Sequence, residues 1–379
     1  MTNTQKLIQW RRYFHAHPEV SNAEFHTTEK LKEILEEMDV QILNLPLTTG
    51  LVAEIGSGEN MVAVRSDIDA LPIDEQTGLT FVSKTTGVMH ACGHDIHIAS
   101  ILGLVLKLKA RESSLNGRVR FIFQASEEVG YGAEGIVKTG ALDGAKAIIG
   151  FHNDPTLKIG EWRAKPGLMT SNVDRFNIHI RAKGAHAAMP QDAKDPHIVL
   201  AQLIQSFQSI VSRNIAPYEE AVITIGQVHS GQTWNVIPDS ARMEGTVRTF
   251  KTDVQSNVAT RMRQICNGVA MQFEVDIDLD YQNVTKAVDN TPELHNIAIT
   301  SAKEAGYHVS ELKRPLTIGE DFSGYQAIAP VYFAMIGSES HYALHHPKFN
   351  PDERILERVP DYFQAFVERL LNVNERIDE

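Results

Sequence analysis

Cysteine is nearly absent from this chain, and its scarcity limits the classes of protein that the sequence allows. Only two of the 379 residues are cysteines, Cys92 and Cys266, and they lie far apart. Two such residues cannot form the disulfide framework of a small secreted domain, so we expect a reducing, cytoplasmic setting. Cys266 continues an apolar helical row and is expected to belong to a core.

Long apolar runs and clusters of basic residues are also missing. The best apolar segment, residues 98–108, is interrupted by Lys107 and falls short of a membrane span. The chain begins without an apolar signal region, so we expect no export and no membrane contact. No basic cluster extends beyond Arg11-Arg12 and the formal net charge is -12, so a nucleic-acid surface is not expected.

Metal-binding side chains are what the sequence does contain. Cys92-Gly93-His94 places a thiol and an imidazole two residues apart, and glycine between them lets the backbone approach closely. Further donors follow at Glu127-Glu128, at His152 and at His345-His346. A lone Cys-x-His step is more often a buried thiol beside a surface histidine, but four donor clusters favour a metal site.

The strand pattern indicates where these donors meet. Several apolar strands lack alternation and are separated by helices, which is typical of a mostly parallel sheet covered on both faces. Asp67, Glu127, Glu128 and His152 each follow such a strand directly. Ligands bind beyond the carboxyl ends of the strands in open α/β sheets, so we expect these residues to converge at one edge.

Between about residues 174 and 285 the pattern changes to strands with one wet face. The order is strand, helix, strand, strand, helix, strand, which describes a small ferredoxin-like α+β domain. We therefore predict an α/β catalytic domain formed by residues 1–173 and 286–379, with an inserted domain at 174–285.

Eight motifs in register resemble one known family. They span nearly the whole chain: Arg11–Glu19, Arg65–Pro72, His90–Asp95, Glu127-Glu128, Gly184–Pro190, Asn235–Pro238, Gly319–Phe322 and Leu344–Pro347. The chain resembles the co-catalytic metallohydrolases of the aminoacylase and carboxypeptidase type. Within them it is similar to the amidohydrolase branch of hippurate hydrolases, indole-acetyl-amino-acid hydrolases and bacterial N-acetyl-amino-acid deacetylases. The resemblance implies a zinc-exopeptidase-like catalytic domain and an inserted lid and dimerisation domain.

The resemblance also implies two divalent metal ions, which zinc, manganese, cobalt or nickel could supply. The ligands it implies are Cys92, His94, Glu128, His152 and His345. The thiolate of Cys92 is expected to bridge the two ions, and His346 is expected to have a supporting role.

Two further residues are expected to take part in amide hydrolysis. Glu127, beside the ligand Glu128, is the candidate general base that moves a proton from water to the leaving nitrogen. The resemblance implies that His186 in the inserted domain reaches across a homodimer, or a higher homo-oligomer, to stabilise the oxyanion.

Four other residues are given supporting roles. Asn235 is expected to act like His186 or to hold the substrate carboxylate, and Arg248 is a weaker carboxylate-binding candidate. Asp67 and Asp95 are expected to orient metal-binding histidines.

The leading hypothesis is hydrolysis of the amide bond of an N-acyl amino acid, such as an N-acetyl amino acid, to a carboxylate and a free amino acid. A dipeptidase or aminopeptidase would share the metal site and differ in its pocket. A catalytically inactive metal-dependent binding protein is an alternative of another class, but Glu127 argues against it because binding needs no general base. A redox sensor based on Cys92 lacks a resolving cysteine nearby.

Overall fold

The structure, a computed structural model, describes residues 2–373, so residues 374–379 of the predicted catalytic segment lie outside the described part. Contacts divide the chain into two compact units. The first comprises Met1–Met169, Val288–Pro315 and Glu320–Glu379, and the second Thr170–Ala287 and Leu316–Gly319. The short return of Leu316–Gly319 has no signal in the sequence pattern. This segment lies against the start of the second unit, because the hydroxyl of Ser171 donates to the carbonyl oxygens of Thr317 and Ile318 at 3.1 Å.

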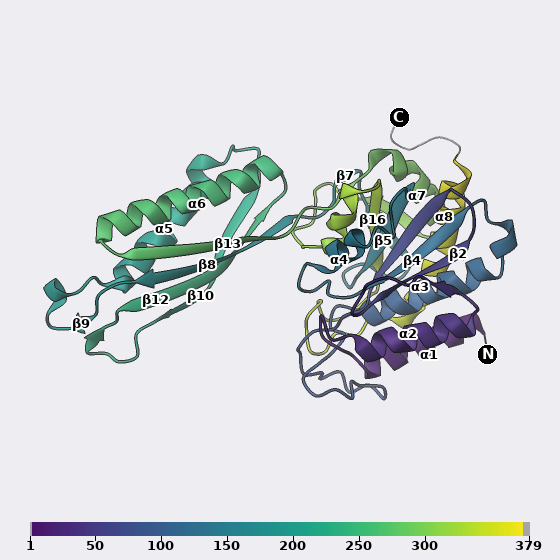
Figure 1. Cartoon of the computed structure of the whole chain (residues 1–379), viewed down its shortest axis with the longest axis horizontal. Helices are drawn as coiled ribbons and strands as arrows, with labels where there is room; N and C mark the ends of the chain where they lie inside the picture. Colours follow the sequence, from purple (N-terminus) through teal and green to yellow (C-terminus); the bar gives the residue numbers. More distant parts are fainter. Residues whose placement is uncertain (1, 374–379) are drawn as a thin grey trace. The chain divides into compact units, whose positions relative to one another are not determined.

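An eight-stranded mixed sheet organises the first unit (Figure 1). In spatial order its strands are β1 (Gln41–Ile42), β2 (Leu51–Gly56), β4 (Arg118–Gln124), β3 (Met61–Asp67), β5 (Ala147–Asp154), β16 (Val331–Gly337), β6 (Glu161–Ala164) and β15 (His308–Glu311). The central run β4-β3-β5-β16 is parallel, whereas β1, β2 and β4 pair antiparallel and so do β16 and β6. The predicted mostly parallel α/β sheet is confirmed.

Burial explains why the central strands lack alternation. Every residue of β3 and of β16 is buried, and so are seven of the eight in β5, because both faces of the sheet are covered. The helices of this unit are α1 (Asn3–Ala16), α2 (Phe25–Glu37), α3 (His94–Lys109), α4 (Gly132–Lys138), α7 (Pro292–Glu304) and α8 (Val359–Asn372). Helix α3 is buried almost all round, as its apolar composition predicts.

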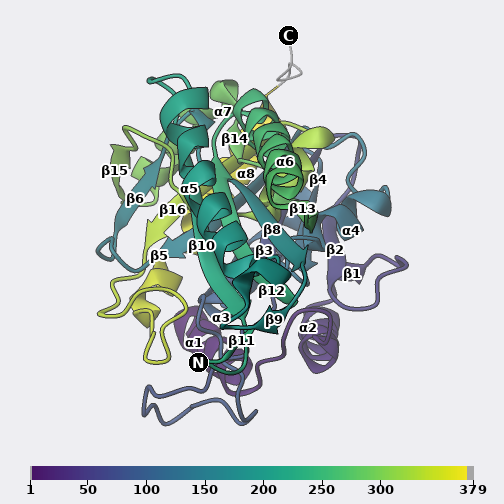
Figure 2. The ribbon, with the colours of Figure 1, turned by 90° about the vertical axis from the view of Figure 1, so that its left-hand side faces the viewer.

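The second unit is a four-stranded antiparallel sheet with two helices on one face. Its strands are β10 (Ala221–Ser230), β12 (Ser240–Thr249), β8 (Asn172–Arg181) and β13 (Asp276–Thr285), in that spatial order. Helices α5 (Pro196–Asn214) and α6 (Thr252–Phe273) lie side by side over the sheet (Figure 2). The order β8-α5-β10-β12-α6-β13 confirms the predicted ferredoxin-like arrangement.

Alternation in the strands of this unit separates its core from its wet face. Phe176, Ile178 and Ile180 of β8 are buried against the two helices, and the residues between them are not. Cys266 is 2% exposed in the same core, as expected. A two-stranded ribbon of β9 (Ala185–His186) and β11 (Val236–Ile237) completes the unit.

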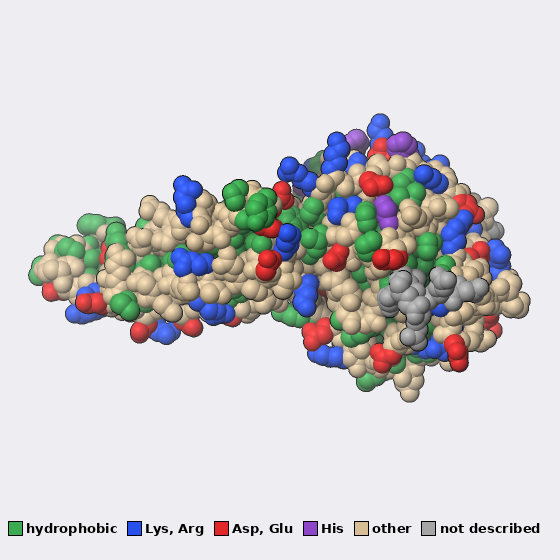
Figure 3. Space-filling view, turned by 90° about the horizontal axis from the view of Figure 1, so that it is seen from above, with side chains coloured by type: hydrophobic (Ala, Val, Ile, Leu, Met, Phe, Trp, Pro, Cys, Tyr) green, Lys and Arg blue, Asp and Glu red, His purple; other side chains and the backbone are tan. Residues whose placement is uncertain are grey.

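The face drawn in Figure 3 carries acidic and basic side chains interspersed among polar ones. Among the helices of residues 2–373, none is long and apolar enough to cross a membrane. Short elements connect the larger ones: β7 (Gly167–Leu168), β14 (Asp289–Asn290), and the 3-10 helices η1 (Glu112–Ser114), η2 (Pro190–Asp192), η3 (Asp321–Ala327) and η4 (Glu353–Glu357).

Candidate metal centre

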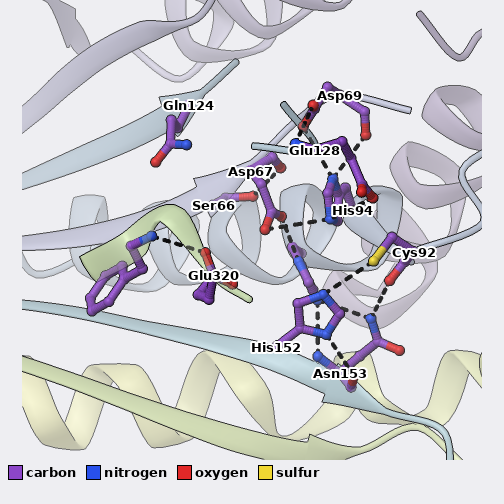
Figure 4. Close-up of polar contacts among 12 residues, drawn as sticks. Ser66, Asp67, Asp69, Cys92, His94, Gln124, Glu128, His152, Asn153 and Glu320 are labelled. Carbon is purple, nitrogen blue, oxygen red and sulfur yellow. Dashed lines mark hydrogen bonds and ion pairs between the residues drawn. The ribbon is translucent and has the colours of Figure 1, made fainter. Parts of the chain in front are cut away.

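The five residues predicted as metal ligands lie close together in the first unit. Four come from the carboxyl edge of the sheet, from the loop before α3 or from the first residue of α3, and Figure 4 shows these four side chains converging. The fifth, His345, comes from the loop after β16 and has a left-handed backbone with φ of 64°. The five residues are Cys92, His94, Glu128, His152 and His345.

Their donor atoms form two groups that share one sulfur. In the first group Cys92, His94 and His152 each offer a donor atom within 4.8 Å of the other two. In the second group Cys92, Glu128 and His345 meet the same limit. The Sγ of Cys92 lies 3.3 Å from Nε2 of His152, and Nε2 of His345 lies 3.6 Å from Oε1 of Glu128.

Hydrogen bonds turn one nitrogen of each buried histidine toward the centre. The Nδ1 of His94 lies 2.9 Å from the carbonyl oxygen of Asp69, and the Nδ1 of His152 lies 2.7 Å from that of Asn153. A carbonyl oxygen can only accept, so each Nδ1 carries a hydrogen, and in the neutral ring Nε2 presents its lone pair. The Nε2 of His94 and Oε1 of Glu128 are buried without a hydrogen-bond partner among the described residues. Free donor atoms of these types fit a divalent cation.

The pKa shifts of the donor residues also fit a bound cation. Burial raises the pKa of Glu128 to about 7. Burial alone would lower the pKa of His94, but the carboxylates of Asp67 and Asp69 outweigh it and raise the pKa to about 10. Burial and nearby carboxylates also raise the pKa of the Cys92 thiol. The surplus of negative charge therefore draws protons onto groups that a bound cation would hold deprotonated.

Glu127 lies beside the two donor groups and faces other carboxylates. Its carboxyl oxygen, one of Glu320 and one of Asp321 lie within 4.8 Å of one another. Burial and these neighbours raise the pKa of Glu127 well above its ordinary value. The fully buried guanidinium of Arg65 offsets part of this charge, because it contacts Glu320 at 3.0 Å and Asp321 at 2.8 Å.

The two aspartates expected to orient metal-binding histidines differ in what they contact. The Oδ2 of Asp67 lies 3.6 Å from Nε2 of the predicted ligand His94. Asp67 binds Nδ1 of His97 at 2.5 Å, and Nε2 of His97 accepts the backbone N–H of Asn153 at 3.0 Å. Asp67 thus acts on the backbone next to His152, through a histidine that the sequence analysis missed. The signal was available, since His94 and His97 are three residues apart on one helix.

For Asp95 the expectation is wrong. Its carboxylate points to the N-terminal helix α1, where it contacts Nε of Arg11 at 2.8 Å and Nδ1 of His15 at 2.9 Å. Asp69 takes the expected place instead, because its carbonyl oxygen binds Nδ1 of His94.

Gly93 allows this packing at the start of α3. Its φ is 89°, in the left-handed region, and a β-carbon there would collide with the side-chain amide of Asn153. That amide donates to the carbonyl oxygen of Cys92 at 2.7 Å. Glycine at this position therefore lets the backbone between Cys92 and His94 lie directly against β5.

The remaining predicted residues lie in the second unit. His186 is exposed and Asn235 is half-buried, and the two are adjacent, since Ala187 N–H donates to the carbonyl oxygen of Asn235 at 3.1 Å. The Nδ1 of His186 accepts the N–H of Ala188 at 3.1 Å, so a neutral ring carries its hydrogen on Nε2. Arg248 is near the other end of β12, roughly 25 Å from the ribbon by strand geometry. The structure does not bring it together with His186.

Comparison with known proteins identifies the family. A model of peptidase family M20/M25/M40 matches residues 63–369. The chain belongs to this family. Membership in the M20 family confirms the resemblance to co-catalytic metallohydrolases drawn from the eight motifs.

Individual relatives agree with the amidohydrolase branch. The N-acetylcysteine deacetylase of Bacillus subtilis (strain 168) is 43% identical over 361 residues, covering 94% of this chain and 95% of the relative. The N-acetyldiaminopimelate deacetylase of Geobacillus sp. (strain WCH70) is 33% identical over 373 residues, covering 97% and 98%.

A solved structure agrees with the fold. It is a Bacillus subtilis protein described as a dinuclear metal binding peptidase from the M20 family, and it is 39% identical with a TM-score of 0.85. The match covers 97% of this chain and 98% of that one, so both units of the present structure belong to the M20 fold.

Proposed function

We propose that this M20 protein is a metal-dependent deacylase that hydrolyses N-acetyl amino acids to acetate and the free amino acid. The observation that carries the proposal is the pair of three-donor groups that share Cys92, together with Glu127, which belongs to neither of them but has a carboxyl oxygen within 4.8 Å of donor atoms of His94 and Glu128. The deacetylase activities of its relatives support the same reaction. A thiol that must ionise also suits the reducing, cytoplasmic setting expected from the scarcity of cysteine.

The ligand assignment follows from the two groups. Cys92, His94 and His152 would hold one ion, and Cys92, Glu128 and His345 would hold the other, so Cys92 belongs to both donor groups. Zinc, manganese, cobalt and nickel all suit this mixture of sulfur, nitrogen and oxygen donors. When bound, the two ions supply an acidified water and a polarised acyl carbonyl.

The side chains of the chain itself move the protons and hold the substrate. Glu127 takes a proton from the attacking water and delivers it to the amide nitrogen, which leaves as an amine. Its neighbours Glu320 and Asp321 favour proton uptake, because a protonated Glu127 relieves the repulsion among the three carboxyls. His186 donates its Nε2–H to the oxyanion, and Asn235 beside it contacts the oxyanion or the substrate carboxylate. Arg248 is the weaker candidate for that carboxylate.

The test of the reaction is a substrate panel. The protein is stripped with a chelator, reloaded with each of the four metals and assayed on N-acetyl amino acids, longer N-acyl amino acids and dipeptides. We expect free amino acid from the N-acetyl substrates and no activity after chelation. Preference for dipeptides would instead indicate a peptidase, and metal binding without hydrolysis of any substrate would indicate a binding protein.

We further propose that the protein is a homodimer formed through the second unit, and that His186 serves the partner's centre. The support is a contrast between the two edge strands. Strand β10 carries no lysine, arginine, aspartate or glutamate, and Val222 and Val228 on it are 49% and 45% exposed. Strand β13 carries three exposed aspartates. Charged side chains block pairing at a sheet edge, so β10 is the edge left open for a second copy.

A matched pair of substitutions tests this assembly. Val228→Lys places a charge on β10, and Gln282→Lys places one on β13. We expect native mass spectrometry to find dimers of the wild type and of Gln282→Lys, and monomers of Val228→Lys. Dimers that persist in Val228→Lys would reject β10 as the interface.

A further inference from the structure

The backbone just before the proposed general base is held in an unfavourable conformation. Ser126 lies between the end of β4 and Glu127, and its φ is 62°, in the left-handed region that residues with a β-carbon rarely adopt. Such a conformation is unfavourable and persists only where surrounding contacts hold it. Its position next to Glu127 makes those contacts informative.

Glu24, from the start of α2, supplies the main contact. Its Oε1 accepts the backbone N–H of Ser126 at 2.8 Å, and its Oε2 accepts the hydroxyl of Thr49 at 2.9 Å. The hydroxyl oxygen of Ser126 in turn accepts the N–H of Asn22 at 2.9 Å. The segment around Glu24 therefore forms hydrogen bonds with both the backbone and the side chain of Ser126.

Glu24 is an unusual residue to find in this place. It is 0% exposed, and among residues 2–373 no lysine or arginine pairs with it. Burial raises the pKa of Glu24, so the interior does not favour its charge. A buried carboxyl without a cation is costly, and a neutral apolar residue would fill the space at less expense. Its hydrogen bonds to Ser126 and Thr49 are contacts that an apolar residue could not make.

The amide on the other side of Glu127 is held in the same way. The N–H of Glu128 donates to Oδ2 of Asp69 at 3.0 Å, and the hydroxyl of Ser21 donates to the same oxygen at 2.7 Å. The two backbone amides flanking Glu127 are thus each bound by a buried carboxylate. One carboxylate, that of Glu24, belongs to the segment of residues 21–24. The other, that of Asp69, is contacted by Ser21 of the same segment.

We propose that Glu24 is a positioning residue, which aims the carboxylate of Glu127 by holding Ser126 in the left-handed conformation. This inference rests on the proposed function of Glu127. Loss of the Glu24 hydrogen bond would let the turn relax toward ordinary backbone angles, and Glu127 would swing away from its proton-transfer position. A misplacement of about 1 Å at a reacting group can lower turnover roughly 100-fold.

A double-mutant cycle with glycine tests the backbone part of this inference. We expect Glu24→Ala to lower kcat roughly 10- to 100-fold, with KM and bound metal nearly unchanged. Glu24→Gln should keep most of kcat, because its carbonyl oxygen still accepts from Ser126. Glycine adopts a positive φ without the β-carbon penalty, so Ser126→Gly should restore part of kcat in the Glu24→Ala background. Ser126→Gly alone should have a smaller effect.

Thr49→Val is the matched control, since it removes the hydrogen bond between Thr49 and Glu24 and leaves both contacts of Glu24 with Ser126, to its N–H and to its hydroxyl. We expect its kcat to stay within about threefold of the wild type, because the Ser126 contact is retained. If Glu24→Ala is too unstable to purify, Glu24→Asp replaces it, because the shorter side chain cannot reach Ser126.

Amide hydrogen exchange of the peptide containing Ser126 separates this inference from the proposed function. In Glu24→Ala that amide should exchange faster than in the wild type, and in Thr49→Val it should not. This result would stand even if no substrate of the panel were hydrolysed. Unchanged exchange in a folded Glu24→Ala protein would overturn the inference. So would faster exchange with unchanged kcat, because Glu24 would then hold the turn without aiming Glu127.

Discussion

The metal centre and the β9–β11 ribbon carry the two halves of the proposed chemistry, and they are built in opposite ways. His94 is 0% and His152 5% exposed, and a backbone carbonyl fixes the ring of each. His186 is exposed and Asn235 beside it is half-buried, and within their own unit the ring of His186 is bound through one backbone N–H. A buried centre is preorganised before substrate arrives, whereas an exposed histidine acts only when another surface meets it.

The difference shows which part of the reaction each unit can perform alone. All five proposed ligands and the proposed base belong to the first unit. Metal binding should therefore be insensitive to changes in the ribbon, and turnover should be sensitive to both. Four experiments test this separation.

The largest effect is expected from removal of a buried ligand. His94→Ala should lose bound metal and lower kcat by more than about three orders of magnitude, because hydrolysis depends on the acidified water. His346→Ala is the control, since His346 follows the ligand His345 without joining either donor group. Metal analysis by mass spectrometry and steady-state kinetics provide the measurements. Full metal content in His94→Ala would remove this residue from the ligand set.

A smaller loss should follow from Glu127→Gln, which keeps the shape of the side chain and removes the base. We expect kcat to fall by roughly two to four orders of magnitude while bound metal persists. Retention of more than about a tenth of the rate would reject the proton-transfer role.

His186→Ala should lower kcat by roughly 100- to 1000-fold without loss of metal, which is the effect of removing an oxyanion donor. If His186 serves the partner's centre, mixing His186→Ala with Glu127→Gln subunits should restore part of the activity. One hybrid site then contains both groups. Mixed dimers seen by native mass spectrometry without any recovered activity would contradict the exchange between subunits.

The relay behind His152 should give the smallest change. His97→Asn removes the link from Asp67 to the backbone of Asn153, and supporting groups of this kind change metal affinity roughly 10- to 100-fold. His295→Asn is a matched control, because His295 is also a buried histidine but binds Tyr332 instead. Competition with a chelator measures the affinity, and equal affinities in the two variants would show that the relay is without effect.

The fold could be predicted from sequence periodicity because the burial of a strand determines which of its positions are apolar. The unbroken apolar strand Met61–Val64 and the alternating Phe176, Ile178 and Ile180 each gave the correct environment. The convergence of Glu127, Glu128 and His152 followed equally from their places at strand ends. Donor chemistry and strand topology are properties of sequence, and these parts of the site could be predicted.

The orientation of supporting side chains could not be predicted in the same way. Asp95 and Asp69 are both near His94, and which of them reaches its ring depends on packing: Arg11 and His15 of α1 draw Asp95 away. The same holds for Glu24, whose partner Ser126 is distant in sequence. Hydrogen bonds between remote segments leave no periodic pattern, so only the folded structure shows them.

The insertion of the second unit has a consequence for the order in which the chain folds. The core of that unit is drawn from one continuous stretch between Phe176 and Tyr281. The sheet of the first unit closes later in the sequence, when Val331 of β16 pairs with Ile148 of β5. Contacts between distant residues form slowly, because a long loop must close first. The inserted unit can therefore fold during synthesis, before β16 has been made. Its folding shortens the loop that must close when β16 pairs with β5.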